Sequence, residues 1–190
     1  MLKNLNSKII ILASQSTRRQ DLLDDLGINF KVIVKPIKEK FPFEMQPHLI
    51  AEYLAKMKSS EFNPKKNEII ITADTVVIHK NNILNKPKNI KEAKEILSNL
   101  SASYHEVVTG VCISQKNNQF SFSELTKVQF KALSDKEINY YVNNFNPMDK
   151  AGAYGIQDWI GKIGIKSIEG CYYNVMGLPL QKLYNYLIKL

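Results

Sequence analysis

Two adjacent arginines are the first indication of chemistry in this sequence. Of the 26 lysines and arginines only Arg18 and Arg19 are arginine, and they stand side by side in ASQSTRR, residues 13–19. A guanidinium group binds phosphate oxygens through two parallel hydrogen bonds, which an ammonium group cannot form. Ser14 adds a hydroxyl donor. The segment predicts an anion site, and two exposed basic residues on a helix are the equally weighted alternative.

A carboxylate interrupts an otherwise apolar stretch in ITADT, residues 71–75. Burying an unpaired carboxylate among apolar side chains costs several kcal/mol, so Asp74 needs a partner. The functional interpretation is that Asp74 holds a divalent cation or takes a proton from an attacking water. The structural interpretation is that it pairs with a lysine at a strand end. On the residues alone both stay open.

A third candidate segment is DKAGAYGIQ, residues 149–157. Its small residues allow the backbone to approach a ligand closely. Lys150 adds a positive charge, and Gln157 carries a donor group and an acceptor on one amide, which suits the edge of a pyrimidine base. A glycine-containing surface turn is the alternative. Lys56 and Lys86 are weaker candidates, since isolated lysines usually face solvent.

One apparent metal pair is less convincing. His105 and Glu106 are adjacent on a predicted strand, so their side chains face opposite sides and do not easily share an ion. We expect His105 to be packed or hydrogen-bonded.

Alternating strand and helix patterns position these segments. Residues 8–13 have the pattern of a buried strand and residues 17–26 that of a helix, so Ser14 falls at a strand-to-helix turn, where free N–H groups favour an anion. Further strands are expected at 30–35, 68–73, 75–79, 105–114, 119–131 and within 150–168, and further helices at 47–60, 90–99, 135–144 and 178–189. Capping pairs mark two helix starts: Asn89 with Glu92, and Ser134 with Glu137. The pattern predicts an α/β fold with a mixed twisted sheet flanked by helices.

The length and composition are those of a folded globular protein. The 190 residues are 44% hydrophobic and 23% charged, and no apolar stretch approaches the roughly 18 residues that a membrane span needs. We expect a single domain over residues 1–190. The N-terminal run IIILA is too short for a signal-peptide core, and two cysteines are too few for a disulfide framework. We therefore expect a cytoplasmic protein.

The net charge of +8 favours anionic partners. A basic nucleic-acid-binding module would explain this charge without catalysis, but such a module clusters its basic and aromatic residues. Here the lysines are scattered along the whole chain. We expect a small anionic ligand as the partner, rather than nucleic acid or a membrane. The oligomeric state stays open, a homodimer included.

Taken in order, these segments resemble the Maf family, also called septum formation proteins, whose members are nucleotide pyrophosphatases. The likeness runs through nearly the whole chain and rests on ASQSTRRQDLLDDLG, ITADTVV, NKPKNIKEAKEILSNLS, YHEVVTGV, and DKAGAYGIQ with IEGCYYNVMGLPL. It implies a Maf/ITPase-like fold with the active site in a cleft between two lobes. It also implies a divalent cation, Mg²⁺ or Mn²⁺, as cofactor. DKAGAYGIQ resembles the subgroup that hydrolyses dTTP and UTP to the monophosphate and pyrophosphate.

The resemblance also implies roles for individual residues. Asp74 matches the family's proton acceptor, and Glu39 is the counterpart of an acidic residue near the second strand. The implied catalytic residues are Asp74, Arg19 and Lys86; the substrate-binding residues are Ser14, Arg18, Lys56, Thr75, Lys150 and Gln157; and the metal ligands are Glu39 and Asp74. Within this set, Arg18, Thr75 and Gln157 match positions tied to substrate choice.

Two other functions remain as alternatives. One is a pyrophosphatase of the same fold that acts on modified purine triphosphates, whereas the dTTP and UTP activity is the one we associate with clearing non-canonical nucleotides. The other is a non-catalytic nucleotide-binding regulator of cell division. Asp74 and the arginine pair are both present, which makes the regulator the weaker alternative.

Overall fold

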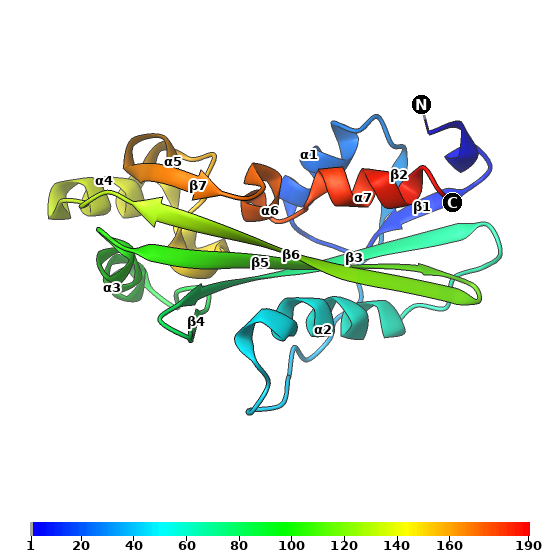
Figure 1. The fold of residues 1–190 in the computed structure, drawn as a ribbon, viewed down its shortest axis with the longest axis horizontal. Helices are drawn as coiled ribbons and strands as arrows, with labels where there is room; N and C mark the ends of the chain where they lie inside the picture. The colour runs from blue at the N-terminus through cyan, green and yellow to red at the C-terminus, as the bar shows by residue number, and fades with distance from the viewer. Residues whose placement is uncertain (1) are drawn as a thin grey trace. The chain divides into compact units, whose positions relative to one another are not determined.

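The computed structural model describes residues 2–190, which form a mixed α/β structure (Figure 1). The strands are β1 (Ile9–Leu12), β2 (Phe30–Val32), β3 (Glu68–His79), β4 (Asn82–Leu84), β5 (Tyr104–Gln115), β6 (Asn118–Phe130) and β7 (Ile165–Glu169). The α-helices are α1 (Thr17–Asp24), α2 (Pro47–Ser60), α3 (Ile90–Leu100), α4 (Asp135–Phe145), α5 (Trp159–Gly164), α6 (Tyr172–Met176) and α7 (Leu180–Leu187).

The strands belong to one mixed sheet in the order β2-β1-β3-β5-β6-β7, with β4 paired to β3. β1 runs parallel to both β2 and β3, whereas β4 is antiparallel to β3 and β7 is antiparallel to β6. β5 and β6 are neighbours joined by only two residues, a connection that antiparallel strands alone allow. The prediction of a mixed sheet with a hairpin is therefore confirmed.

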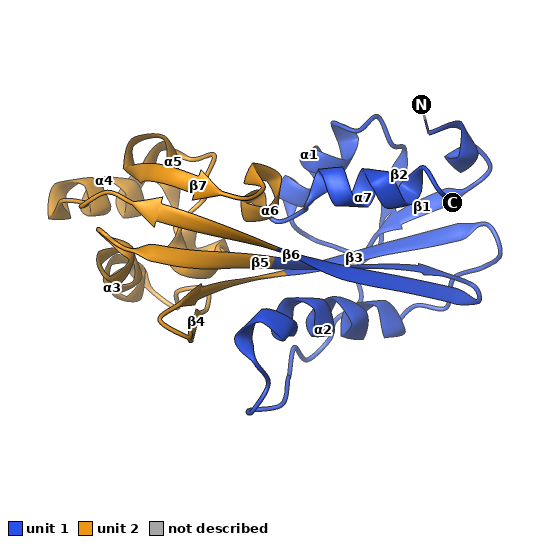
Figure 2. Ribbon diagram, in the orientation of Figure 1, with its two compact units in different colours: residues 1–74, 109–124, 177–190 blue, residues 75–108, 125–176 orange. Residues whose placement is uncertain are grey.

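The chain divides into two compact units, and the boundary falls inside β3, β5 and β6 (Figure 2). Unit 1 comprises the chain up to Asp74 together with Thr109–Glu124 and Gly177–Leu190. Within it, α2 lies on one side of the strands and α1 and α7 on the other (Figure 1). One of its apolar clusters contains Ile11, Ala13 and Ile70, with Ile9 and Phe62 packed against it.

Unit 2 comprises Thr75–Val108 and Leu125–Met176. Helices α3, α4 and α5 share one core there, because the apolar stripe of each faces the others. The buried residues of this core are Ala93, Ile96, Leu97, Leu100, Phe130, Ile138, Tyr141, Val142, Ala153, Tyr154, Ile156 and Ile160. Both predicted helix caps lie in this unit and are confirmed: Asn89 accepts the N–H of Glu92, and Ser134 forms a reciprocal capping box with Glu137.

Two details differ from the prediction. The stretches 68–73 and 75–79 form one continuous strand, β3, so Asp74 lies inside a strand rather than at its end. The short helices α5 and α6 were not predicted, because five or six residues carry too little periodicity to indicate a helix.

No helix formed by residues 2–190 has the length and apolar character needed to cross a membrane.

Candidate active site

The first part of the candidate site is the turn between β1 and α1. Ser16 caps α1, since its hydroxyl accepts the N–H of Arg19 at 3.4 Å. The Ser14 hydroxyl accepts the N–H of Ser16 at 3.2 Å, so the hydroxyls of both serines are drawn toward the start of the helix. The turn thus has the predicted arrangement of a buried strand running into a helix N-terminus, where positive potential is concentrated.

The Arg19 side chain is held against the backbone of unit 1. Its Nε–H donates to the carbonyl oxygen of Gly177 at 2.8 Å, and its Nη1 donates to the carbonyl oxygen of Ala73 at 2.9 Å and to Ser14 Oγ at 3.4 Å. Burial lowers the pKa of Arg19, and the negative charge of Asp74 acts in the opposite direction. Arg19 is therefore a fixed positive group beside Asp74, and Arg18 precedes it in the first turn of the helix.

Asp74 is paired with a lysine that the sequence did not single out. Lys58 Nζ lies 2.5 Å from Asp74 Oδ1 and 2.8 Å from Glu39 Oε1, so one ammonium group bridges two carboxylates. The Asp74 and Lys58 side chains are only 13% and 17% exposed, whereas Glu39 is 51% exposed. The carboxylates of Asp74 and Glu39, the two predicted metal ligands, thus both contact the ammonium group of Lys58.

Lys56, the lysine of α2 that was predicted as a site residue, has a different partner. Its Nζ lies 2.9 Å from Glu52 Oε1, one turn earlier on α2, and its side chain is 48% exposed. Glu52 also accepts the hydroxyl of Ser121 at 2.7 Å. The periodicity of α2 carried the missed signal: Lys58 follows the buried Ala51, Leu54 and Ala55 on one helix face, and Lys56 does not.

Close packing against the sheet fixes the position of α2. Thr72, two residues before Asp74, donates its hydroxyl to the carbonyl oxygen of Ala55 at 2.7 Å. A Cβ at Gly110 would stand 2.2 Å from Glu52 N and 2.3 Å from Ala51 C, so glycine is what lets the helix backbone approach β5. These contacts determine which face of α2, and therefore which lysine, meets Asp74.

The remaining predicted residues belong to unit 2. Thr75 follows Asp74 on β3, and Lys86 is exposed in the loop between β4 and α3. Lys150 Nζ lies 2.8 Å from Asp149 Oδ1 and 3.8 Å from Asp158 Oδ2. Gln157 Oε1 is buried, and it finds no hydrogen-bond partner in the described chain. An acceptor in that state is suited to a donor supplied by a ligand.

The donor set at Asp74 and Glu39 fits a divalent cation. Mg²⁺ in phosphate-binding sites takes one or two protein carboxylates and completes its coordination with phosphate oxygens and water. Two carboxylates that converge on one ammonium group provide such a pair. Residues 2–190 contain no group of three or more His, Cys, Asp or Glu side chains arranged to hold a metal, so the other ligands would come from the substrate and water.

The interpretation of His105 as a packed residue is confirmed. It is buried, its Nε2 lies 2.7 Å from the Tyr154 hydroxyl, and its ring stacks on Phe130. Burial lowers the pKa of His105 to about 3, and the charge of His79 acts in the same direction. His105 is therefore a neutral core residue at physiological pH.

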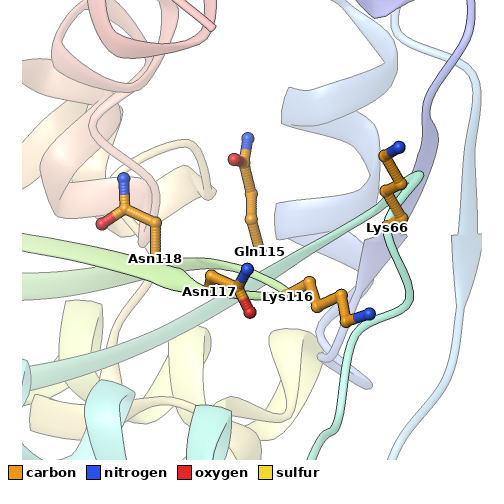
Figure 3. Close-up of a pocket in the computed structure, with 5 residues that line it drawn as sticks. All are labelled: Lys66, Gln115, Lys116, Asn117 and Asn118. Carbon is orange, nitrogen blue, oxygen red and sulfur yellow. The ribbon is translucent and has the colours of Figure 1, made fainter.

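A surface pocket lies at the turn between β5 and β6 (Figure 3). It is lined by Lys66, Gln115, Lys116, Asn117 and Asn118. None of these was predicted as a site residue, and we assign the pocket no role.

The chain is similar to known proteins along its whole length. A family model described as Maf-like protein matches residues 9–190. A dTTP/UTP pyrophosphatase of Cytophaga hutchinsonii is 46% identical over 190 residues, which cover 100% of this chain and 87% of that protein. A dTTP/UTP pyrophosphatase of Phocaeicola vulgatus is 47% identical, with 100% of both chains covered. The solved structure of the Staphylococcus aureus Ham1 protein matches 65% of this chain and 72% of its own, with 13% identity and a TM-score of 0.43.

Proposed function

This chain belongs to the family of Maf-like proteins, and from that premise we propose that it hydrolyses dTTP and UTP to the monophosphate and pyrophosphate. The observation that carries the proposal is the charge cluster of Arg19, Asp74 and Lys58, in which a fixed guanidinium group stands beside a paired carboxylate. The names of full-length relatives at 46–47% identity supply the substrate class. We propose the cytoplasm as the location, since it contains these nucleotides.

Asp74 acts as the general base. Its carboxylate takes a proton from a water molecule whose oxygen attacks phosphorus. Attack on the α-phosphorus breaks its bond to the oxygen that bridges the α- and β-phosphates, and attack on the β-phosphorus breaks the other bond of the same oxygen. The leaving oxygen carries away the electron pair, and the products are a nucleoside monophosphate and pyrophosphate. Arg19 stabilises the negative charge that develops on the phosphate oxygens, because its position is fixed before the substrate binds. Ser14 and Lys86 provide further donors to the phosphates.

Lys58, rather than Lys56, supplies the lysine of the catalytic cluster. Its ammonium group holds the carboxylates of Asp74 and Glu39 together, which keeps Asp74 in one orientation. The resemblance implied Lys56 as a basic, substrate-binding residue, and that role stays a prediction; we propose Lys58 for the cluster because Lys58 contacts Asp74 and Lys56 contacts Glu52.

A divalent cation, Mg²⁺ or Mn²⁺, would be held by Glu39 and Asp74. When bound, such an ion neutralises phosphate charge and orients the triphosphate. The ammonium group of Lys58 already balances part of the charge on the two carboxylates.

Gln157 selects the base. Its buried Oε1 is an acceptor for the N3–H of thymine or uracil, and its amide nitrogen is a donor for a neighbouring carbonyl oxygen. Arg18 and Thr75 are the other residues proposed to contribute to substrate choice, and Lys150 supports the segment that carries Gln157.

A nucleotide panel tests the proposal. Purified protein with Mg²⁺ is incubated with dTTP, UTP, CTP, standard purine triphosphates and modified purine triphosphates, and the products are separated by chromatography. We expect dTTP and UTP to give monophosphate and pyrophosphate. Turnover of modified purine triphosphates alone would favour the alternative substrate class. Release of orthophosphate alone, or no turnover of any nucleotide, would refute the proposal.

Two matched variants test the role of Asp74. Asp74→Asn removes the proton acceptor with little change in shape, and we expect a loss of about 10²–10⁴ in rate. Asp24→Asn, at an exposed position on α1, should retain the wild-type rate. Near-normal turnover by Asp74→Asn would contradict the assignment.

A further inference from the structure

The amide of Gln157 can select a base only if it is held in one orientation. Uracil and thymine present an N3–H donor beside a carbonyl acceptor, whereas cytosine presents an N3 acceptor beside an amino donor. An amide turned by half a rotation exchanges its oxygen and nitrogen, and it then pairs with the cytosine pattern instead. Selectivity for dTTP and UTP therefore requires contacts that hold the segment around Gln157.

The residues on both sides of Gln157 are closely packed. On one side, a Cβ at Gly161 would stand 1.9 Å from the carbonyl oxygen of Ile156, so that carbonyl lies directly against α5. On the other side, the carboxylate of Asp158 turns back toward Gly155, where a Cβ would stand 2.6 Å from Asp158 Oδ2. These approaches leave the backbone around Gln157 little room to move.

The hydroxyl of Tyr141 ties this segment to α4. It donates to Asp158 Oδ2 at 2.7 Å and accepts the backbone N–H of Gly155 at 3.1 Å, so one hydroxyl joins positions before and after Gln157. The Tyr141 side chain is fully buried in the core shared by α3, α4 and α5, which gives the hydroxyl a fixed position. Burial and the neighbouring Asp158 carboxylate raise the pKa of Tyr141 well above its usual value, so the hydroxyl keeps its proton.

We infer that Tyr141 is a positioning residue for base selection: its hydroxyl holds residues 155–158 so that the amide of Gln157 keeps the orientation that pairs with thymine or uracil. The inference rests on the proposed function. The group whose position depends on these contacts is the buried Gln157 Oε1, which has no hydrogen-bond partner among the described residues. Lys150 adds a weaker contact to the same carboxylate, since its Nζ lies 3.8 Å from Asp158 Oδ2.

Tyr141→Phe tests the inference, because it removes the hydroxyl and keeps the buried ring. We measure kcat and KM for UTP, dTTP and CTP. The ratio of kcat/KM for UTP to that for CTP should fall about 5–10-fold, the effect of losing one well-placed hydrogen bond. The fall should come mainly from a higher KM for UTP. Tyr140→Phe on the same helix, at a half-exposed position, is the matched control and should keep the wild-type ratio.

A second variant covers the case in which Tyr141→Phe does not fold. Asp158→Ala removes the acceptor of the same hydrogen bond without changing the core of α4, and it should lower the UTP/CTP ratio to a similar extent. A general loss of stability would not change this ratio, since both nucleotides are assayed with the same folded fraction. A wild-type ratio in the variants that fold would overturn the inference.

Gln157→Ala separates the inference from the function on which it rests. If Gln157→Ala abolishes the preference for UTP while Tyr141→Phe and Asp158→Ala retain it, the inference about Tyr141 is wrong and the base-reading role of Gln157 stands. If wild-type protein shows no preference for UTP over CTP, or Gln157→Ala keeps it, the base-reading role fails and the inference fails with it.

Discussion

Replacing Lys58 by methionine tests the charge cluster most directly, because methionine has a similar length and no charge. The substitution leaves the carboxylates of Asp74 and Glu39 without the ammonium group that lies 2.5 and 2.8 Å from them. Lys56→Met is the matched comparison, since it removes the same charge two residues away on the same helix. Lys58→Met therefore removes the lysine that contacts Asp74 and Glu39, whereas Lys56→Met removes the lysine that contacts Glu52.

The expected cost follows from the exposure of each partner. A hydrogen bond to a charged group that is mostly buried contributes about 1.5–3 kcal/mol, and the Asp74 side chain is only 13% exposed. Glu39 is half exposed and adds at most about 1 kcal/mol. Lys58→Met should thus lose about 2–3 kcal/mol, which lowers Tm by about 4–12 °C for a protein of this size. Lys56→Met breaks only an exposed pair one helical turn apart and should lose about 0.3–0.5 kcal/mol.

Activity separates the two lysines further. Loss of Lys58 should reduce kcat/KM for UTP by about 10²–10³, because Asp74 loses its fixed orientation and the phosphates lose a nearby positive charge. Loss of Lys56 should change kcat/KM by less than about threefold, the effect of one exposed charge. Thermal unfolding and steady-state kinetics on both variants provide the measurement. The reasoning is refuted if Lys58→Met keeps wild-type turnover, or if Lys56→Met is the more damaging change.

Three further predictions concern the fold around the site. Ser134→Ala removes the capping box of α4 and should cost about 1–2 kcal/mol in urea unfolding, whereas an unchanged midpoint would contradict the role of the cap. Gly110→Ala places a methyl group within 2.4 Å of the α2 backbone and should cost about 3 kcal/mol or more, or abolish soluble expression; wild-type Tm would show that α2 can shift. The pKa of His105 is about 3 in the folded protein and about 6.5 in the unfolded chain, so the unfolded chain binds the proton first as pH falls. The free energy of unfolding should therefore fall as pH drops from about 6.5 toward 3, by about 2 kcal/mol between pH 7 and 5. His105→Gln should remove most of that decline, and exposed His48→Gln should not; equal pH slopes in all three proteins would contradict this.

Local signals predicted much of the fold. The run from the strand at residues 8–13 into the helix that begins at Thr17 was correct, since a buried strand, capping residues and a terminal glycine all agree there. The caps of α3 and α4 and the hairpin of β5 and β6 were also predicted correctly. Helices α5 and α6 were missed because their few residues are positioned by packing: Gly161 lies against the Ile156 carbonyl, a contact that local periodicity does not reveal.

The candidate site was only partly predictable. Arg19, Asp74 and Glu39 were singled out from the sequence and its family resemblance, and the structure places their charges close together. The roles of all the predicted site residues stay predictions. The partner of Asp74 was missed because the resemblance led to Lys56, although the periodicity of α2 places Lys58 on the buried face of that helix.

The chemistry of the cluster therefore depends on how α2 packs. Lys56 and Lys58 are about 200° apart around a helix of 3.6 residues per turn, so a moderate rotation of α2 would turn Lys58 away from Asp74. Two contacts oppose that rotation: the hydroxyl of Thr72 binds the Ala55 carbonyl, and Gly110 admits the backbone of Ala51 against β5. Thr72 lies two residues before Asp74 on β3, so its side chain faces α2 from the same side of the strand. The strand that carries Asp74, the proposed general base, thus also fixes the helix that carries Lys58, and damage to that packing should reduce catalysis before it unfolds the protein.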